Sequence, residues 1–334
     1  MGEWERNREE GLLRLEQAKD AAARVDAVDA LRELALSVGK GRARELQAAL
    51  PGLLVDTEGT VRAAAVALAA TVLEPSELED LVAARLGDAD PEVRVEAAAQ
   101  LAHMARPDTR GLLARGLEDE VFEVRFESAC GMAALRHPAG LDVLLQGLED
   151  TRLRFRALGA LGELGDARAV PAVRKVFRKW FLSAFERTQA AAVLASLGEE
   201  DGARHLVKRL GRGWTPDRAM AAELAGEVRL SGARERLLEL LADVDEPARG
   251  AAARGLGRLG DTTALPALVA VLEEPGLHED IRLDVLEGLC HLRTPEAHAR
   301  VREALPALPL GAERHELEAL LEECAAALAG EATR

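Results

Sequence analysis

The sequence predicts an all-α protein made of helix pairs stacked into an extended array, an α-solenoid. Hydrophobic residues make up 48% of the 334 residues and aromatic residues only 3%, with no tyrosine, so the apolar content is mainly alanine, leucine and valine. Alanine and leucine lead the helix-propensity scale, and alanine lets neighbouring helices approach closely. No long stretch alternates apolar and polar residues as strands do.

The stretch 88–118 shows the unit that is repeated. Asp88-Ala89-Asp90-Pro91 is a turn that also caps a first helix, whose small apolar residues end at Leu101. A second turn at 106–108 leads into a shorter helix with leucines on one side. Two such helices still leave an apolar face open, so the unit has to stack on copies of itself.

An arginine in the first helix of each pair marks the register of the repeats. These marker arginines are Arg62, Arg94, Arg125, Arg154, Arg187, Arg218, Arg249 and Arg282, at steps of 32, 31, 29, 33, 31, 31 and 33 residues. In four repeats an aspartate lies six residues before the arginine: Asp56, Asp88, Asp119 and Asp243. Such pairs can form charge-assisted hydrogen bonds within and between units, so we interpret the marker arginines as structural.

The two ends of the chain depart from the repeat. Residues 3–20 read as a charged amphipathic helix, followed by a degenerate helix pair at about 26–38 and 42–54. Residues 312–329 read as a final helix with leucines on one side. Arrays need such atypical units to cover their open ends. We therefore predict one solenoid domain with N-terminal capping helices at 1–55, eight repeats at 56–308, and a C-terminal capping helix and tail at 309–334.

Composition limits the environment and the partners. The net charge of -15 and the pI near 5.1 disfavour general nucleic-acid binding, which needs a surplus of lysine and arginine. The N-terminus has no apolar signal segment, and no apolar run is long enough to span a membrane. The three cysteines lie far apart in expected helices, so we expect buried thiols and a cytoplasmic protein.

The turn residues carry a family resemblance. Two first helices close on Leu-Gly-Asp, at Leu164-Gly165-Asp166 and Leu259-Gly260-Asp261, and proline then enters the first turn of the second helix at Pro171 and Pro266. With the Val-Arg-x-x-Ala pattern of the first helices, this resembles the HEAT family, in particular the short HEAT-like repeats of bilin lyases. The resemblance covers about residues 56–305. It implies a right-handed, armadillo-like superhelix with the second helices lining the concave face.

The sequence carries no catalytic or metal-binding motif. The repeats also resemble those of deoxyhypusine hydroxylase, whose iron is held by His-Glu pairs just after the helix arginine, but none of the eight corresponding dipeptides here contains histidine. None of the seven histidines belongs to a His-Glu-x-x-His motif, and His291 with His298 has no evident third ligand. We expect a protein that is not an enzyme and holds neither metal nor cofactor.

One region departs from the repeat pattern. All six phenylalanines fall between residues 122 and 185, and the window 168–218 holds eleven lysines and arginines against five acidic residues. At one position near the end of the second helix most repeats carry an acidic residue, but the charge there is positive at Lys179 and Arg212. Either the aromatic residues fill an irregular junction between the fourth and fifth repeats, or the region is a docking site in which arginine and tryptophan anchor a partner.

We therefore predict a non-catalytic scaffold or adaptor that binds another protein on its concave face, through an acidic docking segment of that partner. The candidate partner-binding residues are Lys175, Arg178, Lys179, Trp180, Phe181, Phe185, Lys208, Arg209, Arg212 and Trp214. Two alternatives stay open: a chromophore binder similar to the bilin lyases, and a nucleic-acid binder similar to the HEAT-like DNA glycosylases. Nucleic acid is the less expected partner because the rest of the chain is acidic. The oligomeric state is left open.

Overall fold

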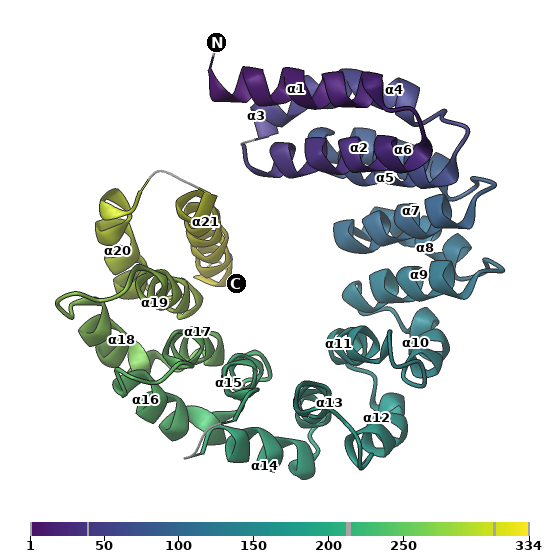
Figure 1. The fold of residues 1–334 in the computed structure, drawn as a ribbon. Coiled ribbons are helices and arrows are strands. Elements are labelled where there is room, and N and C mark those ends of the chain that lie inside the picture. The colour runs from purple at the N-terminus through teal and green to yellow at the C-terminus, as the bar shows by residue number, and fades with distance from the viewer. Residues whose placement is uncertain (1, 39, 212–214, 310–311, 333–334) are drawn as a thin grey trace. The chain divides into compact units, whose positions relative to one another are not determined.

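The computed structural model describes residues 2–38, 40–211, 215–309 and 312–332, and these residues form helices and turns with no strand. The prediction of an all-α solenoid is confirmed. The helices divide into two compact units, Met1–Leu153 and Arg154–Arg334 (Figure 1). The boundary falls between two repeats, directly before the first helix of the fourth helix pair.

The first unit begins with capping helices and continues with three helix pairs. The helices are α1 (Glu3–Gln17), α2 (Ala21–Leu36), α3 (Lys40–Ala43) and α4 (Leu50–Leu53), then α5 (Gly59–Val72) with α6 (Pro75–Arg85), α7 (Pro91–Met104) with α8 (Arg110–Gly116), and α9 (Phe122–Ala134) with α10 (Leu141–Gly147). The expected helix 3–20 ends at Gln17, and Asp20 caps α2 by accepting a hydrogen bond from the Ala23 amide. The expected helix 42–54 is broken by a 3₁₀ segment at Arg44–Ala49.

The second unit holds five helix pairs and a final helix. These are α11 (Arg154–Leu164) with α12 (Val170–Phe177), α13 (Ala184–Ser196) with α14 (Glu200–Arg209), α15 (Arg218–Glu227) with α16 (Arg234–Ala242), α17 (Arg249–Leu259) with α18 (Leu265–Leu272), α19 (Glu279–His291) with α20 (Pro295–Ala304), and then α21 (Ala312–Ala332). Several second helices in both units follow a short 3₁₀ turn, and in three of the described cases the residue before the turn caps it: His137, Asp166 and Asp261. Asp166 and Asp261, which end the two Leu-Gly-Asp segments, each accept a backbone amide two residues further on.

Within the second unit the first helices α11, α13, α15, α17 and α19 form an inner row, and the second helices α12, α14, α16, α18 and α20 form an outer row (Figure 1). The first helices of this row approach one another closely. A side chain at Gly226 would collide with the backbone of Gly255, and one at Gly257 would collide with the backbone of Gly288. The expectation that the second helices line the concave face is therefore wrong for this unit, because the row that packs backbone against backbone is the inner one.

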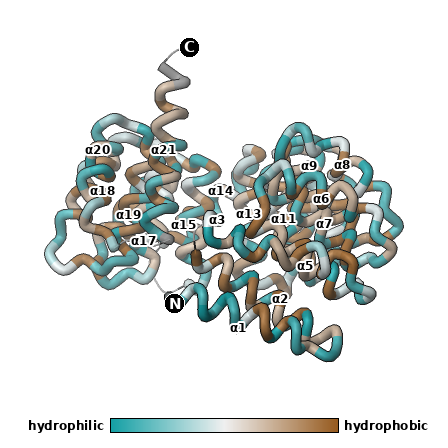
Figure 2. The backbone as a smooth tube through the Cα atoms, turned by 90° about the horizontal axis from the view of Figure 1, so that it is seen from above, coloured by the Kyte–Doolittle hydropathy of each residue, from teal (hydrophilic) through white to brown (hydrophobic). Residues whose placement is uncertain are grey.

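Each unit buries its own apolar core of leucine, valine and alanine. In the first unit the core runs from Trp4 to Met132, and in the second unit a continuous core runs from Leu210 to Cys324. Hydrophobic residues recur along the helices rather than gathering in one segment (Figure 2). Cys290 and Cys324 are buried, as the sequence predicts, whereas Cys130 is only half-buried. Burial raises the pKa of the Cys290 thiol to about 12, so this residue behaves as an apolar core side chain.

Candidate interaction surface

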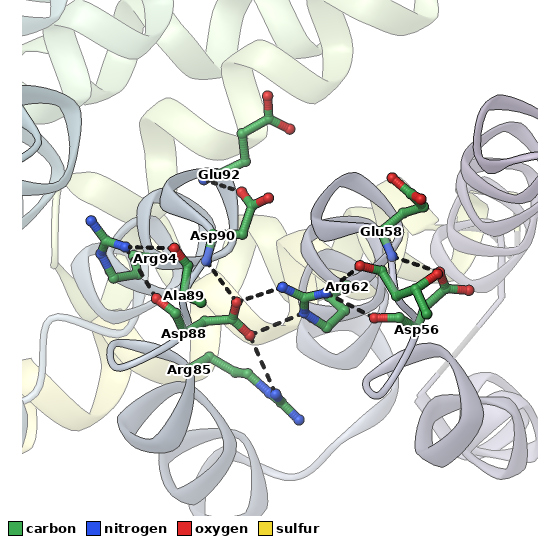
Figure 3. A network of polar contacts seen from close by, with 10 residues as sticks. Asp56, Glu58, Arg62, Arg85, Asp88, Ala89, Asp90, Glu92 and Arg94 are labelled. Atoms are coloured by element: carbon green, nitrogen blue, oxygen red, sulfur yellow. Dashed lines mark hydrogen bonds and ion pairs between the residues drawn. The ribbon is translucent and has the colours of Figure 1, made fainter.

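The marker arginines form a ladder with the turn aspartates in the first unit (Figure 3). The Arg62 guanidinium binds both carboxylate oxygens of Asp88, in the next repeat, at 2.7 and 3.1 Å. The same guanidinium donates at 2.8 Å to the carbonyl oxygen of Asp56, in the turn of its own repeat. The hydrogen bond from Arg62 lowers the pKa of Asp88, although burial acts against it, so the carboxylate stays charged in the ladder.

The next two repeats reuse this geometry. Arg94 binds the two carboxylate oxygens of Asp119 at 2.8 and 3.1 Å and donates at 3.1 Å to the carbonyl oxygen of Asp88. Arg125 in turn donates at 2.7 Å to the carbonyl oxygen of Asp119. Each arginine thus fastens the turn of its own repeat, and Arg62 and Arg94 also hold the aspartate of the following one, as the structural interpretation of the marker arginines predicts.

In the second unit the carboxylate partners are glutamates. Arg154 binds Glu186 at 3.2 Å, Arg218 binds Glu246 at 2.5 Å, and Arg249 binds Glu274 at 2.5 Å. Glu186 lies in the first turn of α13, seven residues after position 179. Position 179 in this repeat is equivalent to the position that Asp119 occupies in its own repeat. That position is occupied here by Lys179, so the sign reversal seen in the sequence has displaced the carboxylate partner of Arg154.

Arg187 fastens the turn of its own repeat, as the other marker arginines do. Its guanidinium donates to the backbone carbonyl oxygens of Phe177, at the end of α12, and of Lys179, the latter at 2.8 Å. Residues 178–183, which join α12 to α13, are called the aromatic loop below. The backbone at the start of the loop is therefore fixed to the body of the unit by two hydrogen bonds from a charged donor. Such charge-assisted hydrogen bonds are among the stronger hydrogen bonds in proteins.

The second half of the aromatic loop is fixed by a capping box. The Ser183 hydroxyl accepts the Glu186 amide at 3.1 Å, while the Glu186 carboxylate accepts the Ser183 hydroxyl at 2.7 Å and the Ser183 amide at 3.3 Å. Glu186 is itself held by Arg154. Because both ends are bonded in this way, the loop presents its side chains from a defined backbone.

The loop carries two aromatic side chains that lie almost entirely in solvent. Trp180 is 86% exposed and Phe181 is 96% exposed, and their ring centroids lie 6.5 Å apart in an edge-to-face arrangement. Phe185, in the first turn of α13, is 46% exposed. The alternative that aromatic residues fill an irregular junction is therefore wrong for Trp180 and Phe181. It describes Phe177, which packs edge-on against His205 with ring centroids 5.3 Å apart.

The predicted basic residues fall into two groups. Lys175 on α12, Arg178 in the aromatic loop and Lys208 on α14 are exposed, and Lys179 is partly exposed. Arg178 lies 4.0 Å from Asp201 at the start of α14. Lys175, Arg178, Lys179, Trp180, Phe181, Phe185 and Lys208 are called the basic-aromatic surface below. Because α12 and α14 belong to the outer row, this surface does not lie on the inner face of the unit where the sequence-based prediction put it.

Arg209 is part of the framework beneath that surface. Its Nε donates to the Asp217 carboxylate at 2.9 Å, and Asp217 is fully buried and also accepts the Thr188 hydroxyl. Burial alone would raise the pKa of Asp217, but these hydrogen bonds hold it below its ordinary value. Arg209 therefore compensates a buried negative charge. The remaining predicted residues, Arg212 and Trp214, lie outside the described residues.

The side chains of the described segments show no arrangement of three His, Cys, Asp or Glu that could hold a metal ion. The two histidines with helical spacing have other contacts: His298 is buried with Nε2 3.0 Å from the Cys290 carbonyl oxygen, and His291 Nε2 lies 3.6 Å from the Glu287 carboxylate. Among the described helices, none is long and apolar enough to cross a membrane.

Sequence reasoning missed the support given by Arg187. The signal was available, because Arg187 stands in register with the other marker arginines. Like Arg62 and Arg94, it donates to carbonyl oxygens of the turn that precedes its own helix, and this turn is the one that carries the exposed aromatic residues.

The stacked pairs, the ladder and the short 3₁₀-led second helices define a class, the α-solenoids built from HEAT repeats. The family model for HEAT repeats matches residues 78–153 and 214–290, and the model for the PBS lyase HEAT-like repeat matches residues 153–179. The chain belongs to the HEAT-repeat family. No curated protein sequence matches it.

Many solved structures are similar to the chain, among them the following three. The complex of CpcE and CpcF of phycocyanin lyase from Nostoc sp. PCC7120 is 16% identical, with a TM-score of 0.49 over 86% of this chain and 95% of that one. Human deoxyhypusine hydroxylase in complex with glycerol is 21% identical, with a TM-score of 0.33 over 75% and 96%. Kap121p is 14% identical, with a TM-score of 0.45 over 91% of this chain and 39% of that one.

Proposed function

We propose that this HEAT-repeat chain is a non-catalytic scaffold or adaptor that binds an acidic segment of a partner protein through the basic-aromatic surface. The observation that carries the proposal is the pair Trp180 and Phe181. These two side chains are almost fully exposed, yet they stand on a loop that is bonded to the body of the unit at both ends.

The energetics favour an interface over a chance exposure. A buried Trp or Phe side chain removes roughly 150–250 Å² of surface from water. Leaving two such side chains exposed therefore forgoes hydrophobic stabilisation of the folded state. Tryptophan and arginine are the residue types most often found as binding hot spots. A loop that is already ordered also lowers the entropy lost on binding, because its conformation need not be fixed at that moment.

The basic residues define the kind of partner. Arg178 and Lys179 directly precede the aromatic pair in the loop, and Lys175 and Lys208 lie on α12 and α14, in a chain whose net charge is -15. An acidic segment would be steered to this patch and turned away by the rest of the surface. Exposed charges are screened at distances beyond about 8 Å at physiological ionic strength, so the affinity should fall as salt is raised.

The proposal is tested by affinity capture from native lysate with three forms of the protein: wild type, Trp180→Ser/Phe181→Ser, and the control Val244→Ser. Val244 is 68% exposed in the turn between α16 and α17, which is the equivalent connection two repeats later. The proposal expects a protein that wild type and the control both capture and the aromatic variant does not. Equal capture by all three forms would remove the basic-aromatic surface as the docking site.

A charge-reversal pair tests the electrostatic part. Lys175→Glu/Lys208→Glu should weaken capture of the same partner, whereas Arg110→Glu/Arg115→Glu, which alters two exposed arginines on α8 in the first unit, should not. The two alternatives have their own readouts in the same preparation. A nucleic acid in the eluate would support the nucleic-acid binder, and a purified protein that becomes coloured with a tetrapyrrole would support the chromophore binder.

A further inference from the structure

A groove with an apolar floor lies between α19 and α21 in the second unit, away from the basic-aromatic surface. Figure 1 places α21 beside α19, and the groove has a volume of about 350 Å³. Its lining consists of Leu283, Asp284 and Glu287 from α19, and Glu313, Glu316, Leu317 and Leu320 from α21. This volume is at the lower end of the range for ligand sites, roughly 300–1,000 Å³, so the groove admits side chains and not a folded domain.

The lining residues are arranged as two matched helix faces. Glu316, Leu317 and Leu320 follow Glu313 by three, four and seven residues, so the four residues share one side of α21. Leu283 and Glu287 share one side of α19 for the same reason. Leu317 is buried, while Leu283 and Leu320 are only half-buried. The leucines therefore form a floor that is partly open to solvent, with carboxylates along both edges.

The carboxylates on the α19 edge are held in place from α17. Arg254 forms an ion pair with Asp284, and Arg258 binds Glu287 at 2.7 Å. Burial alone would raise the pKa of Glu287, but the hydrogen bond from His291 and the charges of Arg258 and Arg254 hold it below its ordinary value. Glu287 is thus ionised at neutral pH, and both carboxylates of the α19 edge have counter-charges.

The α21 edge has a different charge balance. Glu313 and Glu316 are exposed, and α21 as a whole carries six acidic residues against one arginine. A helix that served only to cover the end of an apolar array would gain nothing from an excess of like charge, because neighbouring carboxylates on one helix repel one another. An added positive charge would therefore be stabilised at this edge.

We propose that the groove between α19 and α21 binds a basic amphipathic segment of a partner protein. Its apolar side chains contact Leu283, Leu317 and Leu320, and its lysines or arginines lie against Glu313 and Glu316. The charge required is opposite to that required at the basic-aromatic surface, so this is a second docking site for a different kind of segment. An amphipathic helix laid in an apolar groove is a common mode of peptide recognition.

The test uses a fluorescently labelled basic amphipathic peptide, with leucines at helical spacing and lysines on the other faces, and follows its anisotropy with the full chain. A second peptide has the same composition in scrambled order, so it keeps the charge and loses the apolar face. The protein variants are Glu313→Gln/Glu316→Gln in the groove and the matched control Glu235→Gln/Glu239→Gln, two exposed glutamates on α16.

The proposal expects the amphipathic peptide to bind wild type and the control equally, and the groove variant about tenfold more weakly, which corresponds to about 1.4 kcal/mol. The scrambled peptide should bind much more weakly to all three. Equal affinities for the groove variant and the control, or equal affinities for the two peptides, would overturn it, since either result means diffuse attraction to an acidic protein. Trp180→Ser/Phe181→Ser should leave this binding unchanged, so failure here is distinct from failure of the proposed function.

Discussion

The guanidinium of Arg187 donates a 2.8 Å hydrogen bond to the carbonyl oxygen of Lys179, and this bond holds the aromatic loop beside α13. Other marker arginines make the same kind of bond to the turn of their own repeat, as Arg94 does to the carbonyl oxygen of Asp88. This turn carries Lys179 at a position that is acidic in most repeats, and Arg154, which would pair with an acid there, binds Glu186 instead. Glu186 also closes the capping box with Ser183, so the rearranged ladder contact and the Arg187 bond together fix the loop that carries Trp180 and Phe181.

Replacing Arg187 with alanine should loosen the aromatic loop without unfolding the unit. Hydrogen bonds to charged groups contribute about 1.5–3 kcal/mol each, so local opening of residues 178–183 should become markedly easier. Hydrogen exchange followed by mass spectrometry is the direct measurement. The control is Arg125→Ala, which removes the analogous bonds to the carbonyl oxygens of Asp119 and Glu120 and should speed exchange there instead. Unchanged exchange in 178–183 would show that the capping box alone orders the loop.

Lys208 and Arg209 are neighbours in the sequence and should respond differently to the same change. Lys208→Gln should leave the free energy of unfolding within about 0.5 kcal/mol of wild type, as is usual for an exposed residue. Arg209→Gln should cost about 3 kcal/mol or more, because it leaves the buried Asp217 carboxylate without its charged partner. Chemical denaturation of both variants measures this directly. A similar, small cost for both would contradict the structural role of Arg209.

The stability of the second unit should fall in mild acid because of His205. Burial, followed by the positive charge of Arg209, lowers the pKa of His205 from 6.5 to about 4. Between these values the unfolded chain binds a proton that the folded chain does not, so the stabilisation is complete above pH 6.5 and is lost as the pH falls toward 4. The change is at most about 3 kcal/mol.

The control for this prediction removes the titrating group while keeping the ring contact with Phe177. His205→Phe should flatten the decline in melting temperature between neutral pH and pH 4, whereas His103→Leu, at an exposed site in the first unit, should leave it in place. A decline of the same size in His205→Phe would assign the acid sensitivity to the carboxylates of the ladder instead.

The repeat pattern predicted most of the fold because it is a local signal. The marker arginines and the turn aspartates recur about every thirty residues. The contacts they make, such as Arg62 with Asp88, stay within one repeat or join neighbouring repeats. The sign reversal at Lys179 likewise pointed to a surface whose aromatic residues the structure finds exposed. These features depend on one residue and its immediate neighbours in the array.

What the sequence could not show depends on how rows of helices pack. Whether α12 lies on the inner or the outer row follows from the close approach of glycines such as Gly226 and Gly255, which a single repeat does not reveal. Arg209 and Lys208 differ in role because Arg209 binds Asp217, which lies eight residues away and is buried only in the folded unit. Charge and exposure can be read from periodicity in part, whereas the partner of a buried group cannot.

Arg94→Ala should destabilise the first unit and leave binding at the basic-aromatic surface unchanged. Arg94 is nearly buried and holds both oxygens of Asp119, and burial alone would raise the pKa of that carboxyl while the hydrogen bonds from Arg94 and the Val121 amide keep it low. Removing the arginine leaves a poorly solvated carboxylate, at a cost of about 3 kcal/mol. Thermal and denaturant unfolding would measure this, with Arg110→Ala on the exposed face of α8 as the control.

A double-mutant cycle with Asp119→Asn separates the pair from its surroundings. If Arg94 acts mainly through Asp119, the double variant should lose clearly less stability than the sum of the two single variants, because the second change removes the charge that the first left unpartnered. Strict additivity would mean that Arg94 acts instead through the carbonyl oxygens of Asp88 and Ala89, to which it also donates. In either case the ladder arginine is part of the scaffold, and a melting temperature unchanged in Arg94→Ala is the result that would refute that role.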